Sequence, residues 1–257
     1  MKTRLLALLF LPLLFIGSCK KDKALNETGE MTVRMMDGPS PYGFQEVNID
    51  VRSVEVHIAN SFDDGWHTLH TTAGIYNVLT LTNGLDTMLA NAILPAGQVT
   101  SIRLNLGPNN SLRFNNVVYP LSVPSGEESG LKIVINEHIT STAPLLLYLD
   151  FDAGQSIVLN GNGSYHLKPV IHAFTAVNTG TVTGTLSTPG PGKAIAFTNS
   201  TRTHITYANA ISGRFMVRGL TPGVYSATVY TASAETVFMN ITVTANQNTE
   251  MGILVVP

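Results

Sequence analysis

The chain has 257 residues, of which 44% are hydrophobic and 12% are charged, with 15 Lys and Arg against 17 Asp and Glu. This near balance excludes the concentrated basic face that phosphate binding requires, so we expect no nucleic-acid partner. The single cysteine, Cys19, excludes a disulfide within the chain, and the fold must therefore be held together by core packing.

A short apolar segment, residues 5–16, follows Lys2 and Arg4. A positive charge before an apolar run is typical of a secretory signal. The run is too short for a membrane-spanning helix, which needs about 20 apolar residues. We therefore expect residues 1–18 to be a signal peptide that is removed on export.

The end of this segment, Ile16-Gly17-Ser18-Cys19, resembles the bacterial lipobox, in which a peptidase cuts before a cysteine that carries lipid. The alternative is an ordinary signal peptide with a chance cysteine. Because the chain's only cysteine stands where the motif needs it, lipid attachment such as palmitate at Cys19 is favoured. Residues 19–28 would then be a tether. The product would be an outer-membrane lipoprotein of the cell envelope, in the periplasmic or the surface-facing leaflet.

From residue 31 onward the apolar residues recur with a period of two, which predicts a mainly all-β fold. Residues 31–35, 47–51 and 102–106 alternate in this way. Between Val51 and Val54 the apolar phase slips by one residue. The slip predicts either a β-bulge within one strand or two strands with a tight break.

Two pairs of short apolar runs flank turn-forming residues and predict hairpins, one around Asn115-Asn116 and one around residues 160–163. The only helical spacing is that of Leu85, Met88 and Leu89, so the first domain is expected to hold at most one short helix.

Near Asn178 the composition shifts to small and β-branched residues. We expect two β-sandwich-like domains, residues 29–177 and 178–257. Residues 213–225 resemble a strand and turn of the carboxypeptidase-regulatory-like, transthyretin-like sandwiches. In that motif Phe215 and Val217 point into the core, Pro222 and Gly223 form the turn, and Tyr225 begins the next buried strand.

A second resemblance is carried by residues 31–39, 47–51, 54–57, 94–97, 102–104, 124–125, 129–132, 149–153 and 165–171. These residues resemble the domain of unknown function numbered 4382, a family found in bacterial lipoproteins. That resemblance implies a lipoprotein with a β domain and supplies no catalytic residues.

Asp150 and Asp152 are two residues apart in an alternating segment, so both carboxylates should leave the same face of one strand. They could bind Ca²⁺ if Asp37 or backbone carbonyls joined them. Equally, they could cap a solvated sheet face or pair with Arg34, Arg103 or Lys168. A calcium ion takes roughly six to eight oxygen ligands, more than this spacing supplies, so we expect a structural role and no metal or cofactor.

Other candidates are weaker. His67 and His70, like His166 and His172, lack the further ligands that zinc requires and are interpreted as surface histidines. Asp86-Thr87-Met88 resembles a bacterial O-glycosylation triplet with Thr87 as the acceptor. The aromatic residues in turn-rich stretches could stack on a ligand, and they are Tyr42, Phe44, Phe62 and Trp66.

No serine-hydrolase elbow and no phosphate-binding glycine loop occurs in the sequence, so we expect no enzyme. The leading interpretation is a non-catalytic envelope lipoprotein, anchored in the membrane by lipid, that binds a protein or glycan partner through loops of its first domain. The alternatives are a fimbrial-type subunit with residues 251–256 as a donor strand, or a hydrolase that gathers acids from distant positions.

Overall fold

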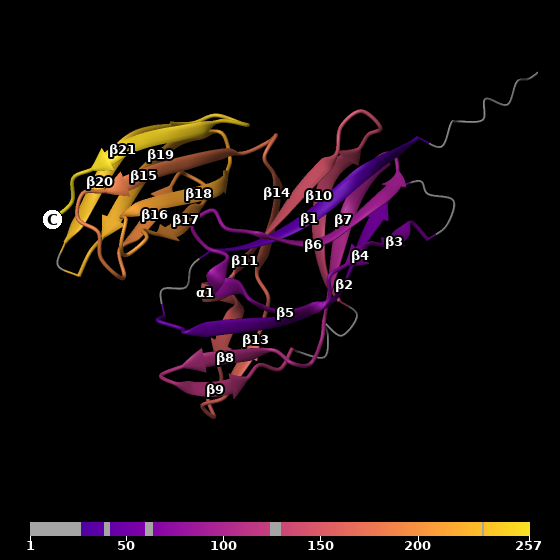
Figure 1. Ribbon diagram of the computed structural model, residues 1–257, viewed down its shortest axis with the longest axis horizontal. Helices are drawn as coiled ribbons and strands as arrows, with labels where there is room; N and C mark the ends of the chain where they lie inside the picture. The colour runs from indigo at the N-terminus through magenta and orange to yellow at the C-terminus, as the bar shows by residue number, and fades with distance from the viewer. Residues whose placement is uncertain (1–26, 39–41, 60–63, 124–129, 233) are drawn as a thin grey trace, which may run out of the picture.

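Alternating apolar residues form strands throughout the chain, and the fold is all-β as predicted (Figure 1). We analysed a computed structural model that describes residues 27–38, 42–59, 64–123, 130–232 and 234–257. The predicted signal peptide and Cys19 lie outside these residues. None of the helices in the described ranges is long and apolar enough to cross a membrane.

Within the described residues, the first part of the chain contains fourteen strands and two helical turns. In chain order they are β1 (Thr28–Gly38), β2 (Glu46–Ile58), β3 (Trp66–Thr68), β4 (His70–Thr71), β5 (Gly74–Asn77), the 3₁₀ helix η1 (Val78–Thr80), β6 (Thr87–Pro95), β7 (Gly97–Leu106), β8 (Ser111–Phe114), β9 (Val117–Pro120), β10 (Leu131–Ile139), β11 (Leu145–Asp152), α1 (Ala153–Ser156), β12 (Ile157–Leu159), β13 (Tyr165–Leu167) and β14 (Ile171–Thr175).

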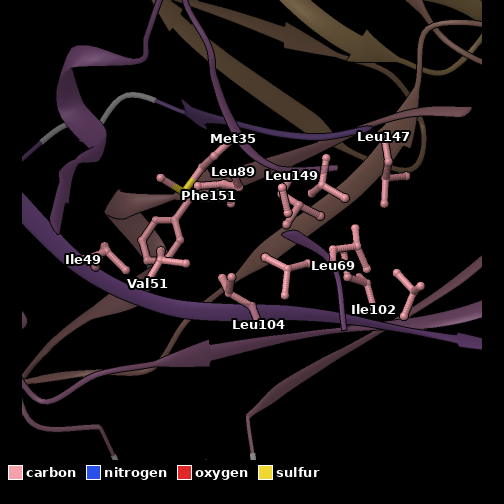
Figure 2. Close-up of a cluster of buried hydrophobic side chains, with 14 of the residues drawn as sticks. Met35, Ile49, Val51, Leu69, Leu89, Ile102, Leu104, Leu147, Leu149 and Phe151 are labelled. Carbon is pink, nitrogen blue, oxygen red and sulfur yellow. The ribbon is translucent and has the colours of Figure 1, made fainter. Parts of the chain in front are cut away.

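Two sheets of this part enclose one core. Sheet A has the order β14-β11-β1-β6-β4, and β1 and β11 run parallel in it. Sheet B has the order β10-β7-β2-β8-β9, and β3 and β5 also pair with β2. Side chains from both sheets meet between them, as Figure 2 shows for Met35 and Phe151 of sheet A and Ile49 and Leu104 of sheet B.

The phase slip near Val51 is a β-bulge. Strand β2 runs unbroken from Glu46 to Ile58, and its register against β7 shifts between Val51 and Ser53. The shift returns Val54 to the core face, where it is fully buried. The first of the two predicted alternatives is therefore confirmed.

Both predicted hairpins are also present. Strands β8 and β9 pair around Asn115 and Asn116, whose φ angles are 50° and 62°. Two successive positive φ angles belong to the tight turn that suits the twist of paired strands. Strands β12 and β13 pair around residues 160–163.

The short helix predicted at Leu85–Met88–Leu89 is wrong. Asn83 and Gly84 have φ angles of 56° and 83° and reverse the chain, and β6 then pairs with β1. Met88 is exposed while Leu89 is buried, so the two share no face. A helix of two turns is marginal on its own, and nine residues of strand pairing outweigh it.

The second part of the chain forms a smaller sandwich around a separate hydrophobic cluster. Its sheets have the orders β18-β15-β21 and β17-β16-β19-β20. As the motif predicts, Phe215, Val217 and Tyr225 are buried. The strands are β15 (Gly180–Leu186), β16 (Ala194–Thr198), β17 (Thr203–Tyr207), β18 (Arg214–Leu220), β19 (Gly223–Tyr230), β20 (Glu235–Val243) and β21 (Asn248–Leu254).

Candidate functional site

One end of the outer face of sheet A, which carries Met36 and Asp150, lies against residues of the second domain. On β1, Met31, Val33 and Met35 fill the core, so Arg34 and Met36 point away from it. Met36 is nevertheless only 6% exposed. It lies beside β17 and β18, which approach this face in the view of Figure 1.

A shared carboxylate joins the two domains. Asp86, in the turn before β6, is only 11% exposed and accepts hydrogen bonds from Arg34 of β1 and Arg218 of β18. The Arg218 Nη1 atom lies 2.7 Å from Asp86 Oδ2. The Arg218 guanidinium also lies 5.7 Å from the centre of the Tyr148 ring, which stacks on Phe174. Charge and aromatic contacts therefore tie β18 to sheet A.

Two glycines permit this close approach. A Cβ atom at Gly219 would lie 2.8 Å from Cε1 of Phe174, and one at Gly84 would overlap the side chain of Met216. Beside Gly84, the Asn83 amide donates to the carbonyl oxygen of Arg214 at 3.2 Å. A side chain at Gly219 would therefore meet the Phe174 ring, whereas one at Gly84 would require the Met216 side chain to move.

A cavity of about 250 Å³ remains between the domains. A second cavity, of about 230 Å³, shares with it Asp150, Arg202, His204 and Arg218. We call the first one the interdomain cavity. Its walls include Met36, Tyr42, Asn83, Asp150, Asp152 and Gln155 of the first domain and Arg202, His204, Thr206, Met216 and Arg218 of the second.

Asp150 and Asp152 lie on one face of β11, as the spacing predicts, and both line the interdomain cavity. Asp152 caps helix α1, because its Oδ1 atom accepts a hydrogen bond from the Gln155 backbone nitrogen at 2.9 Å. Among the described residues, no three His, Cys, Asp or Glu side chains are placed to hold a metal ion. The Asp37 side chain lies outside that part of the structure.

Of the basic residues considered as partners for these aspartates, namely Arg34, Arg103 and Lys168, the first two pair with other carboxylates. Arg34 pairs with Asp86, and Arg103 of β7 pairs with Glu55 of β2 at 2.8 Å. The sequence pattern did not predict that Asp86, just before β6, would form the ion pair with Arg34.

His172, interpreted from sequence as a surface residue, is half-buried and lines the second cavity, where His204 joins it. Burial, the charge of Arg202 and the nearby His172 lower the pKa of His204 to about 4. Burial and Arg202 also lower the pKa of His172, while Asp152 partly opposes the shift. Both imidazoles are therefore neutral at pH 7. No sequence motif marked His204 or Arg202, and the resemblance over residues 213–225 gave Arg218 no functional role.

The other histidines lie away from the interdomain cavity. His67 is in β3 and His70 is in β4. The Nδ1 atom of His166, in β13, is 2.7 Å from the Asn160 side-chain oxygen.

Of the candidate aromatic residues that the structure describes, Tyr42, Phe44 and Trp66, only Tyr42 lines the cavity. Tyr42 is 60% exposed at its rim. Phe44 instead meets Phe114 edge-on, with ring centres 5.7 Å apart. Trp66 belongs to β3, where the guanidinium carbon of Arg103 lies 3.9 Å from its ring centre. Phe62 lies outside the described residues.

Thr87, the predicted glycan acceptor, is the first residue of β6 and is half-buried. Its neighbour Asp86 is engaged with Arg34 and Arg218. Glycosylation of Thr87 stays a prediction.

The lowered pKa of His204 predicts a loss of stability in acid. As the pH falls from 6.5 to about 4, the unfolded chain takes up a proton before the folded chain does. Stability should therefore fall over that window by on the order of 2–3 kcal/mol. Glutamine does not titrate, so in His204→Gln this pH-dependent part of the free energy of unfolding is absent. Urea unfolding between pH 7 and pH 4 should therefore show a smaller decrease in the free energy of unfolding than in the unaltered protein. An equal decline in both proteins would contradict the burial of this imidazole.

The chain is remotely similar to several solved structures. The Bacillus anthracis TIE protein matches 90% of this chain and 34% of its own, at 12% identity and a TM-score of 0.25. A fimbrial protein from Bacteroides ovatus matches 90% and 50%, at 7% identity and a TM-score of 0.23. The major pilin subunit of Bacillus cereus matches 89% and 70%, at 8% identity and a TM-score of 0.21. The chain thus spans half or less of the first two, and such scores are too low to imply a shared fold or function.

No curated protein matches the chain. A family profile does match, and it covers residues 28–169, from the start of β1 to just before β14. This is more than half of the 257 residues and includes the wall of the interdomain cavity that carries Asp150 and Asp152. The chain therefore belongs to the family described as a domain of unknown function, DUF4382.

Proposed function

We propose that the chain is a non-catalytic lipoprotein of the cell envelope that binds a glycan or protein partner in the interdomain cavity. The observation that carries this proposal is the cavity itself, to which both domains contribute polar side chains. A concave site with a few converging polar groups is the usual form of a ligand site. A ligand that bound only to loops of the first domain would not contact the cavity residues of the second domain, such as Arg202 and His204.

The lining chemistry favours binding of a polar ligand. Asn83 and Gln155 present amides that both donate and accept hydrogen bonds, and Asp150 presents acceptors. Tyr42 adds an exposed ring at the rim, and aromatic rings stack on ligands. Asp152 and Arg218 already serve the helix cap and the domain contact.

We also propose that the second domain, residues 178–257, is a carboxypeptidase-regulatory-like sandwich. Support comes from residues 213–225, whose motif residues Phe215 and Tyr225 lie in its core. Its last strand, β21, pairs with β15 of the same chain. The proposal therefore rests on the cavity and not on strand exchange between subunits.

Binding can be tested with the protein from residue 19 onward, carrying Cys19→Ser, on a glycan array and by isothermal calorimetry with the glycans it retains. In Met216→Trp a larger side chain should fill the cavity and weaken binding at least tenfold. Ile211→Trp adds the same ring at a position that is 90% exposed and should leave binding unchanged. Equal affinity of the two variants would place the ligand elsewhere. Turnover of a retained glycan that Asp150→Ala abolishes would refute the non-catalytic role.

The lipid anchor gives a separate prediction. Full-length protein expressed in a bacterium should carry fatty acyl chains on Cys19 and partition into the detergent phase. Cys19→Ser should lack the acyl mass, because serine offers no thiol for the lipid, and it should keep residues 1–18, because the lipobox peptidase cuts before a lipid-carrying cysteine. Mass spectrometry of the mature N-terminus decides the matter. A free thiol at Cys19 in the unaltered protein would exclude the anchor.

A further inference from the structure

One arginine between the domains, Arg202, has no carboxylate within 4 Å among the residues that the structure describes. Arg34, Arg52, Arg103, Arg113 and Arg218 each pair with a carboxylate within 4 Å. Arg202 is half-buried, and its guanidinium makes no hydrogen bond or ion pair with any described residue. A partly buried cation loses hydration without compensation, so an anionic ligand there would be favourable.

Arg202 is held in place by a well-defined turn. The Asn199 side-chain oxygen accepts hydrogen bonds from the backbone nitrogens of Thr201 and Arg202, both at 2.9 Å. The Asn199 nitrogen donates to the Arg202 carbonyl oxygen at 3.0 Å. The turn joins β16 to β17, so Arg202 projects from the edge of the second domain that faces sheet A.

The position of Arg202 gives its charge access to both cavities, since it lines each of them together with His204. The same charge lowers the pKa of both neighbouring histidines. Those imidazoles then stay uncharged and can donate or accept hydrogen bonds beside an anion.

We propose that Arg202 binds the carboxylate of an acidic saccharide that occupies the interdomain cavity. The inference rests on the function proposed above and names its ligand class. The guanidinium can engage a carboxylate through two parallel hydrogen bonds. The opposite wall carries Asp150, Asn83 and Gln155, which suit the hydroxyl groups of a sugar ring.

Size and shape favour a sugar. A volume of about 250 Å³ lies just below the range for drug-sized ligands and suits one ring rather than a long chain. The exposed Tyr42 ring at the rim could stack on the next unit. With the carboxylate at Arg202 and the hydroxyls at Asp150, the ligand would bridge the two domains.

Calorimetry with matched probes tests the assignment. The acidic probes are 3′-sialyllactose and trigalacturonic acid, the neutral ones are lactose and galactotriose, and a tetraglutamate peptide supplies carboxylates without a sugar. At least one acidic saccharide should bind tenfold or more tightly than its neutral counterpart. Arg202→Gln should abolish that preference, and Arg202→Lys should restore only part of it. Arg214→Gln, which removes an exposed arginine outside both cavities, should change nothing. Thermal unfolding of each variant confirms that it is folded.

The outcomes separate the two proposals. Equal binding of acidic and neutral saccharides, or an acidic preference that survives Arg202→Gln, overturns the role of Arg202 and leaves a glycan-binding cavity. Binding of tetraglutamate without any saccharide overturns the ligand class. Binding of none of the five probes, with no glycan retained on the array, overturns the proposed glycan function and this inference together.

Discussion

Replacing Asp86 with alanine should lower the free energy of unfolding by about 2–3 kcal/mol and loosen the contact between the domains. Two arginines, one from each domain, would lose their shared carboxylate. Breaking a fully buried pair costs roughly 3–5 kcal/mol. Arg34 and Arg218 are 32% and 26% exposed, so solvent screening reduces that figure. Urea unfolding at pH 7 and low salt measures the loss.

The matched control is Glu46→Ala, which removes the carboxylate paired with Arg113 at the surface of the first domain. Both of those side chains are more than a third exposed, so the loss should stay below about 1 kcal/mol. A loss for Asp86→Ala no larger than that for Glu46→Ala would show that Asp86 does not join the domains.

A single added methyl group at Gly219 should also destabilise the protein, by about 2–4 kcal/mol. Gly219 has a φ angle of 74°, a conformation that costs other residues roughly 1–2 kcal/mol. Its new Cβ atom would also lie 2.8 Å from Cε1 of Phe174, which stacks on Tyr148. Gly219→Ala should therefore force the second domain away from sheet A.

Gly192→Ala separates these two effects. Gly192 has nearly the same φ angle, 72°, and a Cβ atom there would meet nothing within 4 Å. Its substitution should cost only the backbone strain. If thermal unfolding shows equal losses for the two variants, the contact between Gly219 and Phe174 does not exist in solution.

The strands were predictable because their cause is local. The alternation in β1 and β7, the phase slip after Val51 and the paired asparagines at 115 and 116 each act over a few residues. The helix expected near Leu85 failed for the opposite reason. Its residues were drawn into β6 by pairing with β1, which lies about fifty residues earlier in the chain.

Only the first-domain wall of the interdomain cavity could be predicted from the sequence. Asp150 and Asp152 could be assigned to one face because they share a strand. Arg202, His204 and Arg218 reach the same cavity only because the second domain packs on the outer face of sheet A. That packing depends on Asp86 and on two glycines, Gly84 and Gly219, whose roles follow from contacts between distant segments. No local pattern carries such information.

An engineered disulfide between Gly84 and Met216 tests most directly whether the domains dock to form the interdomain cavity. A Cβ atom at Gly84 would lie 3.4 Å from Cβ of Met216, close to the separation of about 3.5–4.5 Å found in disulfides. With Cys19→Ser as background, Gly84→Cys combined with Met216→Cys should oxidise within one chain and leave no titratable thiol in the folded protein. Gly84→Cys combined with Gly192→Cys should keep both thiols free. If the first pair also keeps both thiols free under the same conditions, the two domains do not meet at this surface and the cavity between them is not a binding site.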